Sequence, residues 1–249
     1  MLLIENDADL NKIVAELQKG PAIGVDLEAD SMFHYQEKVC LLQISTHALH
    51  IVIDPLSVQD LSPLAPVFAD ARIRKVFHGA DYDIRSLYRD FGIEVHSLFD
   101  TQIATRFLGV RETGLASLLK MRFDVLCDKK YQKKDWSQRP LPAAMLKYAV
   151  QDICYLLPLT DILERELMEK GLLFCVEEEC ERLSGVRPNS SRNKPLFLSF
   201  KGAAGLDPRS LAVLEKSYAF GIRWPDAEIA LISRCWAIIR SWRLPESNR

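Results

Sequence analysis

Three apolar runs, each the length of a β-strand and too short for a core helix, follow one another closely near the amino end of this chain. They cover residues 22–28, 39–45 and 49–53. The short gap between the last two predicts a hairpin. Two more short runs, at residues 75–78 and 94–98, alternate with helical patterns. Strands that first pair in a hairpin and then alternate with helices predict an α/β fold with a mixed β-sheet flanked by helices.

Segments with the apolar spacing of α-helices flank these predicted strands. In residues 7–18 the apolar side chains fall on one helix face; they are Leu10, Ile13, Val14 and Leu17. Gly20-Pro21 is expected to end this helix. Further helices are expected at residues 61–69, 81–91, 101–108 and 115–120. From residue 141 the pattern is almost wholly helical. Pro142 suits a first helical turn, Pro158 is expected to kink or divide the helix, and another helix is expected over 172–183.

Composition fits a globular chain with one sizeable core and a small appendage, since 48% of its residues are hydrophobic and 27% are charged. The first residues lack the basic start and long apolar stretch of a secretory signal, and no apolar run approaches ~20 residues. We therefore expect a cytoplasmic protein that does not cross a membrane. Six cysteines without Cys-x-x-Cys spacing indicate buried free thiols, which suit a reducing compartment.

Four acids and one tyrosine carry the chemistry of the sequence. Asp26 and Glu28 end a predicted strand, where residues i and i+2 project to one face. Tyr148 and Asp152 lie four apart in a helical stretch, so they share one helix face. Asp83 lies near the start of another predicted helix. Converging carboxylates repel one another unless divalent cations neutralise them, and Mg²⁺ or Mn²⁺ prefers oxygen ligands. These five residues therefore predict a site for two metal ions, of the kind that nucleases use.

Each of these residues also has a plainer interpretation. Asp26 and Glu28 could be solvated acids at a strand end. Asp81, two residues before Asp83, could cap the helix. Tyr148 taken alone would be read as a core aromatic residue, and His78 as a satisfied core histidine.

Six short motifs stand in one order along the chain, and together they resemble a known family. They include Val25-Asp-Leu-Glu-Ala-Asp, Val76-Phe-His-Gly-Ala-Asp-Tyr-Asp-Ile, Leu98-Phe-Asp-Thr, Lys134-Asp-Trp-Ser-Gln-Arg-Pro-Leu and Tyr148-Ala-Val-Gln-Asp. The chain resembles the ribonuclease D branch of the DEDD 3′–5′ exonucleases, in the subclass whose third motif carries a tyrosine. The resemblance runs from the first strand to about Glu181 and implies a ribonuclease H-like fold for the exonuclease domain, residues 1–183.

The resemblance also implies a role for each site residue. Asp26 would bridge two divalent ions, Mg²⁺ or Mn²⁺. Glu28 and Asp152 would hold the ion that binds the attacking water, and Asp83 would support the other ion through water. Tyr148 would orient the water, because a phenol with a pKa near 10 is a poor base at neutral pH.

Two segments are expected to contact the substrate. Residues 129–139 hold several cations beside the rings of Tyr131 and Trp136, and from these we select Lys133, Lys134, Trp136 and Arg139 as candidate contacts to phosphates and bases. A solvated basic loop is the plainer alternative. After the first acidic motif, Met32, Phe33 and Tyr35 could wedge against terminal bases or could serve local packing alone.

The expected function is a metal-dependent 3′–5′ exoribonuclease acting on single-stranded RNA 3′ ends, with tRNA precursors as the substrate that the resemblance suggests. A monomer is expected. Two alternatives remain open: a 3′–5′ exonuclease that acts on DNA, and a noncatalytic RNA-binding module on the same fold.

The end of the chain has a different character. Residues 184–203 have linker composition, and residues 204–249 are expected to be helical. The stretch from Leu206 to Lys216 resembles the first helix of an HRDC domain, a helical RNA-binding module. After about residue 221 the resemblance stops. In permitted codons, a shifted frame from the Gly221 codon reads His-Pro-Val-Ala-Arg-Arg-Arg-Asp-Arg-Pro-His-Phe-Lys-Val-Leu-Gly-Asn, which resembles the next HRDC segment. A frame change is therefore the hypothesis, and a divergent helical tail is the alternative.

Overall fold

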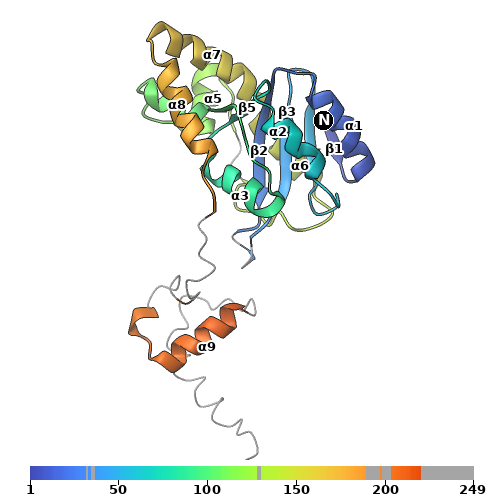
Figure 1. The fold of residues 1–249 in the computed structure, drawn as a ribbon, viewed down its shortest axis with the longest axis vertical. Coiled ribbons are helices and arrows are strands. Elements are labelled where there is room, and N and C mark those ends of the chain that lie inside the picture. The colour runs from blue at the N-terminus through green and yellow to red at the C-terminus, as the bar shows by residue number, and fades with distance from the viewer. Residues whose placement is uncertain (32, 35–36, 128–129, 189–196, 198–202, 220–249) are drawn as a thin grey trace, which may run out of the picture. The chain divides into compact units, whose positions relative to one another are not determined.

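The computed structural model describes residues 1–31, 33–34, 37–127, 130–188, 197 and 203–219. The chain divides into two compact units. The first comprises Met1–Phe33 and Glu37–Pro188, and the second comprises His34–Gln36 and Asn189–Arg249. Figure 1 shows the elements of each unit along the chain.

A six-stranded mixed sheet forms the centre of the first unit, in the order β1-β4-β3-β2-β5-β6. Its strands are β1 (Leu2–Ile4), β2 (Ala22–Ala29), β3 (Val39–Ser45), β4 (His50–Ile53), β5 (Arg74–Phe77) and β6 (Leu98–Asp100). Strand β2 pairs antiparallel with β3 and parallel with β5, so the polarity of the sheet changes at β2. The prediction of an α/β fold with a mixed sheet is confirmed.

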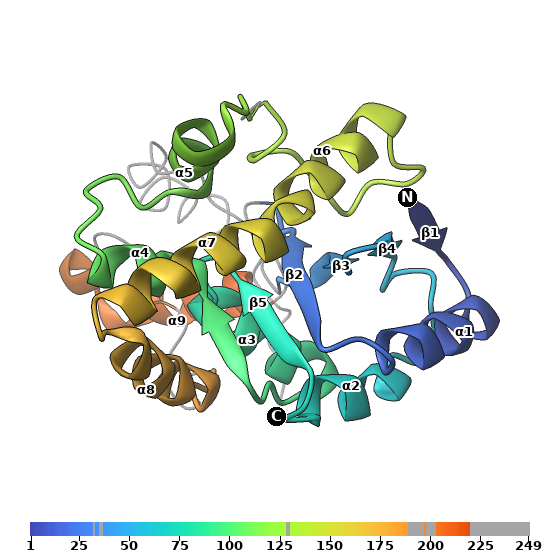
Figure 2. The ribbon, with the colours of Figure 1, turned by 90° about the horizontal axis from the view of Figure 1, so that it is seen from above.

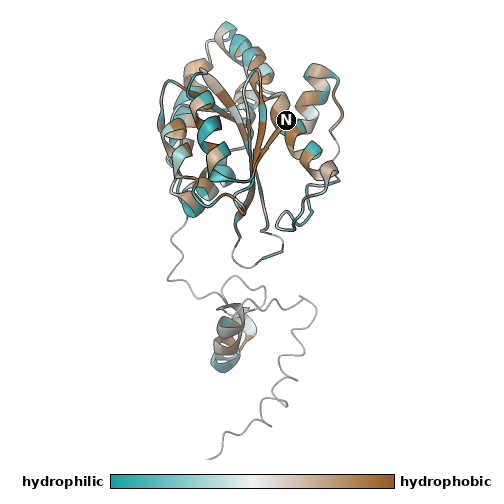
Figure 3. Ribbon diagram, turned by 90° about the vertical axis from the view of Figure 1, so that its right-hand side faces the viewer, coloured by the Kyte–Doolittle hydropathy of each residue, from teal (hydrophilic) through white to brown (hydrophobic). Residues whose placement is uncertain are grey.

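Helices cover both faces of this sheet. They are α1 (Asp7–Leu17), α2 (Ala65–Ala69), α3 (Asp81–Phe91), α4 (Thr101–Phe107), α5 (Leu115–Phe123), α6 (Ala143–Cys154), α7 (Leu156–Glu169) and α8 (Leu173–Ser184), with a 3-10 turn at Ser62–Leu64. Figure 2 shows α6 and α7 crossing one face, while α1, α2 and α3 lie on the other. The strands between them are strongly hydrophobic (Figure 3), and their buried side chains form the core.

Close contacts fix α6 and α7 on the sheet next to the end of β2. The side chain of Ser45 donates a buried hydrogen bond of 2.9 Å to the carbonyl of Ile153, at the end of α6. Gly24 of β2 lies against Leu156 at the start of α7, where a Cβ atom would come within 3.1 Å of the Leu156 Cβ. A side chain at position 24 would therefore push this helix junction away from the strand.

Two local features differ from the sequence predictions, and the expected division of the helix near Pro158 is observed. β1 is an unexpected edge strand, paired in parallel with β4. The strand expected at 94–98 lies later, at Leu98–Asp100. The long helix divides at Tyr155, before Pro158, and Pro158 lies in the first turn of α7, where a proline needs no backbone donor.

In the second unit, the described residues form a 3-10 turn at Ala203–Gly205 and the helix α9 (Pro208–Ala219). The Asp207 carboxylate accepts from the backbone N–H groups of Arg209 and Ser210 at 2.9 and 3.2 Å, which caps the helix. Leu214 is buried against Ala203 and its apolar neighbours. Most of the expected linker and residues 220–249, which include the segment after the hypothetical frame change, lie outside the described residues. Among the helices described here, none combines the length and the apolar character needed to span a membrane.

Candidate active site

The first two acids lie on β2, the strand at which the sheet changes polarity. Asp26 pairs with Gln43 and Glu28 pairs with Leu41 across the antiparallel ladder with β3. Both side chains point to the face that α6 covers, and a register irregularity follows directly after Glu28. The strand therefore presents two carboxylates side by side at its carboxyl end.

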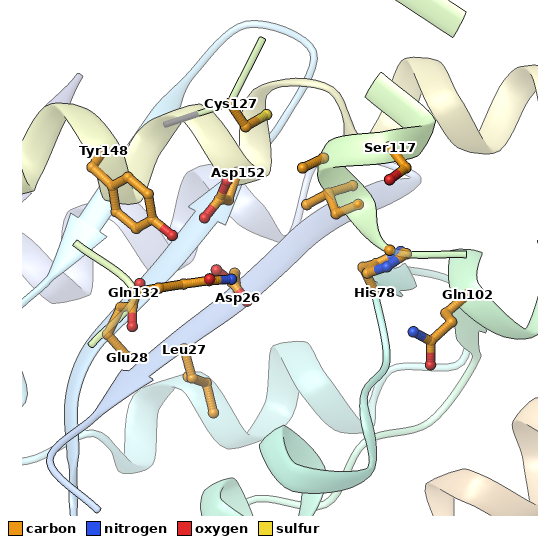
Figure 4. A pocket seen from close by; sticks show the side chains of 13 residues that line it. Asp26, Leu27, Glu28, His78, Gln102, Ser117, Cys127, Gln132, Tyr148 and Asp152 are labelled. Atoms are coloured by element: carbon orange, nitrogen blue, oxygen red, sulfur yellow. The ribbon is translucent and has the colours of Figure 1, made fainter. Parts of the chain in front are cut away.

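Helix α6 supplies the facing residues. Tyr148 and Asp152 are one helical turn apart, and Figure 4 shows both side chains directed at the acids of β2. The Tyr148 side chain hydrogen-bonds that of Asp152. One ligand oxygen from each of Asp26, Glu28 and Asp152 lies within 4.8 Å of the others. Residues that are remote in sequence thus converge on one point.

Asp83 approaches the same cluster from α3. Its side chain is buried, with 8% exposure, while Asp81 forms a salt bridge with Arg85 at the surface. The charge of Asp83 acts on both Asp26 and Glu28. The structure therefore places Asp83, and not Asp81, beside the other acids. Ala80 occupies the helix cap, so the capping role considered for Asp81 is not observed.

Burial and mutual repulsion make these carboxyl groups reluctant to ionise in the metal-free protein. Burial, and then the charges of the neighbouring acids, raises the pKa of Asp26 well above its usual range and the pKa of Glu28 to about 9. Burial and Asp100 raise the pKa of Asp83 to about 7. Burial raises the pKa of Asp152 to about 6, against the hydrogen bond from Tyr148. An added positive charge would stabilise the ionised form of each of these groups.

This donor set fits divalent cations. Within the described part of the chain, no lysine, arginine or histidine forms an ion pair with Asp26, Glu28 or Asp152. Three closely spaced carboxylates with a fourth behind them offer oxygen ligands to hard cations such as Mg²⁺ or Mn²⁺. These four residues are therefore the ones that could hold the ions.

The acids open into a cavity of about 390 Å³. His78, Gln102 and Ser117 line its opposite side (Figure 4). The Nδ1 atom of His78 lies 2.9 Å from the Thr101 hydroxyl, whereas its buried Nε2 has no hydrogen-bond partner among the described residues, so the expectation of a satisfied histidine holds for one ring nitrogen only. Tyr148 lines the cavity as well, and burial together with the adjacent carboxylates raises the pKa of its phenol. Tyr148 therefore stays protonated at neutral pH and can position a water molecule by hydrogen bonding.

Some of the expected substrate contacts lie at the surface. Phe33 is 44% exposed, and Lys133 and Lys134 are exposed as well. Met32 and Tyr35 lie outside the described residues. The roles of these five side chains stay predictions.

Trp136 and Arg139 correct the sequence interpretation. The Trp136 side chain is only 1% exposed, because it packs between the sheet and α6, so its ring is not a surface on which bases can stack. The Arg139 guanidinium binds the buried carboxylate of Asp54, and it is therefore not available to phosphates. Charge and aromatic content indicated an exposed binding loop, but the side chains that look most suited to RNA are turned inward.

Asp100 is a site-forming residue to which the sequence assigned no role. Its carboxylate is 1% exposed and accepts hydrogen bonds from the N–H groups of Gly79, Ala80, Gln102 and Ile103, at 2.7 to 3.3 Å. One acid thus fixes both the start of α4 and the turn that leads into α3. Gly79 has φ +75°, which suits glycine in this turn. An Asp-Thr pair after a strand was the available signal, since such acids often cap helices.

Comparisons with known proteins agree with this geometry. A family model described as 3′–5′ exonuclease matches residues 1–168. Protein RRP6-like 1 of Arabidopsis thaliana is 42% identical over 167 residues, which are 66% of this chain and 26% of that protein. The exosome complex exonuclease RRP6 of Saccharomyces cerevisiae is 37% identical over 194 residues, 78% of this chain and 26% of that protein. The chain thus spans about a quarter of the length of these curated relatives.

Two solved structures share the fold. The catalytic core of RRP6 from Trypanosoma brucei has a TM-score of 0.75 and 35% identity, covering 88% of this chain and 62% of that chain. Escherichia coli RNase D, described as an exoribonuclease involved in structured RNA processing, has a TM-score of 0.70 and 30% identity, covering 88% and 58%.

Proposed function

Because the chain belongs to the 3′–5′ exonuclease family, in the group that includes RRP6 and ribonuclease D, we propose that it is a metal-dependent exoribonuclease that removes nucleotides from RNA 3′ ends. The observation that carries this proposal is the convergence of Asp26, Glu28 and Asp152 within 4.8 Å. Tyr148 lies on the same helix face as Asp152. Three of the motifs that resemble the family thus contribute to one cavity, through Asp26 and Glu28, through His78, and through Tyr148 and Asp152.

The acids would hold the divalent ions, with Asp26, Glu28 and Asp152 closest together and Asp83 behind them. When bound, such ions supply Lewis-acid activation of the attacking water and neutralise charge on the departing oxygen. The protein contributes the remaining functions. Tyr148, protonated at neutral pH, directs the water by hydrogen bonding.

RNA is proposed as the substrate class because Escherichia coli RNase D, whose structure is similar, is described as an exoribonuclease involved in structured RNA processing. We extend the proposal to tRNA precursors on the sequence resemblance alone. A monomeric protein in the cytoplasm is part of the same proposal. It is compatible with the free thiols among the described cysteines, which suit a reducing compartment.

The test uses an RNA and a DNA oligonucleotide of the same sequence, each with a single-stranded 3′ tail and a 5′ label, incubated with the full chain and Mg²⁺ or Mn²⁺. We expect a ladder of products shortened one nucleotide at a time from the RNA. The ladder should be absent with excess chelator, with a 3′-blocked end and with circular RNA.

Other outcomes would identify the alternatives. Preferential shortening of the DNA would show that DNA and not RNA is the substrate, while the proposed metal-dependent hydrolysis from the 3′ end would stand. Binding of RNA without hydrolysis, under every metal condition, would indicate a noncatalytic module. Cleavage of circular RNA would overturn the 3′–5′ assignment.

A further inference from the structure

A buried acid lies at the end of β4, which β3 separates from the acid-bearing strand β2. Asp54 follows β4, and its side chain is 2% exposed. Its oxygens accept from the backbone N–H of Leu56 at 2.9 Å and from the hydroxyl of Ser57 at 3.1 Å. Its own backbone N–H donates to the carbonyl of Ile4 at 2.9 Å. Asp54 is therefore a fixed anchor at the end of two adjacent strands.

Arg139 is bound to this anchor through the Nε–Nη2 edge of its guanidinium. Nε donates to Asp54 Oδ2 at 2.6 Å, and Nη2 donates to Oδ1 at 2.7 Å. Hydrogen bonding by Arg139 and Leu56, together with the arginine's charge, holds the pKa of Asp54 below its usual range despite burial. A paired, two-point contact of this kind fixes direction as well as distance.

The remaining donors of Arg139 hold its own loop to the sheet. Nη2 also donates to the carbonyl of Cys40 on β3 at 2.9 Å. Nη1 donates to the carbonyls of Trp136 and Gln138 at 2.8 and 2.9 Å. The guanidinium thus closes residues 136–139 into a compact loop and attaches that loop to β3 and to Asp54.

The loop in turn supports the catalytic tyrosine. The Trp136 ring lies 6.1 Å from the Tyr148 ring, centroid to centroid, with 34° between their planes. The Tyr131 ring lies 5.8 Å from Tyr148. Trp136 and Tyr148 share a buried cluster with apolar residues of β3, β4 and α6. The position of the Tyr148 ring therefore depends on where Trp136 is held.

We propose that Arg139 and Asp54 form a clamp that positions Tyr148 for catalysis through the ring of Trp136. The inference rests on the proposed exonuclease function and assigns the loop a positioning role in it. Arg139 touches neither the acids nor the cavity. It acts on turnover by fixing the hydroxyl of Tyr148 relative to Asp152.

Lysine cannot replace arginine here. An ammonium group is a point charge, and it cannot reach both Asp54 oxygens and the three carbonyls in this planar arrangement. In Arg139→Lys the charge opposite Asp54 remains, which protects the buried carboxylate, while the hold on residues 136–139 is lost. Because small misplacements of a reacting group can cost about 10²-fold, we expect turnover to fall about 10- to 100-fold.

A double-mutant cycle tests the clamp. Turnover and KM on the 3′-tailed RNA would be measured for wild type, Arg139→Lys, Tyr148→Phe and the double variant, together with Mn²⁺ affinity. We expect Arg139→Lys to lower kcat with little change in KM or Mn²⁺ affinity. In the Tyr148→Phe background, the same substitution should lower kcat less than twofold, since the hydroxyl that the clamp positions is already gone.

Arg74→Lys is the matched control. Arg74 forms ion pairs with Glu164 and Glu177 and also contacts an aromatic ring, but it lies at the opposite end of β5 from the cavity. This variant should keep its kcat. Asp54→Asn is a second test, because it alters the carboxylate partner of Arg139. It should reproduce the kcat loss of Arg139→Lys.

The outcomes separate the clamp from the function itself. If wild type does not shorten RNA or DNA, the proposed function fails. If wild type is active and Tyr148→Phe is impaired, but Arg139→Lys keeps its kcat or lowers it equally in both backgrounds, the clamp is overturned. An equal kcat loss in Arg74→Lys would also overturn it, because loss of any inter-element ion pair would then suffice.

Discussion

The acids of the site are destabilised in their ionised form in the metal-free protein, and added positive charge would stabilise them. Burial alone is unfavourable for each carboxylate, and Asp26 also experiences the charges of Asp83, Glu28 and Asp152. The residues nevertheless stay together because rigid elements hold them. Substitution should therefore separate two properties, the capacity to bind ions and the stability of the metal-free fold.

Asp152→Asn removes one charge and keeps the shape of the side chain. We expect it to abolish detectable nucleotide release and to weaken Mn²⁺ binding, since one charged ligand is lost. The metal-free variant should be at least as stable as wild type, because repulsion within the cluster is relieved. RNA hydrolysis and calorimetric Mn²⁺ titration measure the two effects. Wild-type hydrolysis by this variant would contradict the metal-site assignment.

The same acids predict how stability depends on pH. Their pKa values are raised in the folded state, for Asp152 from 3.8 to about 6 and for Glu28 from 4.5 to about 9. The folded protein therefore binds more protons than the unfolded chain between these values. Stability contributed by these groups must fall as the pH rises from about 4 to about 9.

Thermal denaturation of chelator-treated protein at pH 5 and pH 8 checks this dependence. Wild type should lose more stability between the two pH values than Asp152→Asn does. Added Mn²⁺ should restore stability at pH 8 more than at pH 5, because the ligands are ionised there. Equal pH dependence in the two proteins would show that Asp152 does not titrate as described.

At the scale of elements, one buried carboxylate organises two helices. Asp100 caps α4 and also accepts from the N–H groups of Gly79 and Ala80, which precede α3. Since α3 carries Asp83, the geometry of the metal site depends on a cap that belongs to another helix.

Asp100→Asn should destabilise the fold by about 2 kcal/mol, because an amide donor replaces an oxygen that faces backbone donors. Asp60→Asn is the control. Asp60 also accepts hydrogen bonds, from Ser62, but it is exposed, so water can compensate. Urea unfolding of both variants gives the difference. An equal loss of unfolding free energy in the two variants would mean that the buried hydrogen bonds of Asp100 contribute no more to stability than the exposed ones of Asp60.

Much of the element order could be predicted from sequence, because strand-length apolar runs and helical periods are local signals. β1 could not, since three residues at a sheet edge show no alternation of their own. The acidic site could be predicted because Asp26 and Glu28, two residues apart, share one face of a strand, and Tyr148 and Asp152, four residues apart, share one face of a helix. Trp136 and Arg139 were misread because their partners, Tyr148 and Asp54, lie elsewhere in the chain. Local composition cannot show whether a cation faces solvent or a buried carboxylate.

At the scale of the whole molecule, the two units differ in what they contribute. All the acids, Tyr148 and the clamp residues belong to the first unit. The second contains α9 with a small apolar cluster of its own. The chemistry and the C-terminal region should therefore be separable.

A chain truncated after Pro188 should unfold cooperatively and keep its turnover on a short single-stranded RNA. If residues 189–249 add RNA contacts, the KM for a longer structured RNA should rise, by about 10-fold for a modest loss of multivalent binding. Circular dichroism melts and paired kinetics on the two RNAs measure both effects. Loss of cooperative unfolding would show that the first unit needs the rest of the chain.

We propose further that residues after about 221 derive from a changed reading frame that replaced the rest of an HRDC-like region. Sequencing of the coding DNA tests this. Codons that do not yield the Arg-Arg-Arg-Asp-Arg-Pro frame would remove the proposal and leave a divergent tail.

The order of the catalytic residues along the chain also bears on biosynthesis. β2 leaves the ribosome early with Asp26 and Glu28, whereas Tyr148 and Asp152 follow on α6, after all six strands of the sheet and the helices α1 to α5. A nascent chain that ends before α6 therefore carries three of the four acids, Asp26, Glu28 and Asp83, and lacks Asp152 and Tyr148. Such a chain lacks a complete site, so we expect no RNA hydrolysis by it until α6 has emerged and packed against β2.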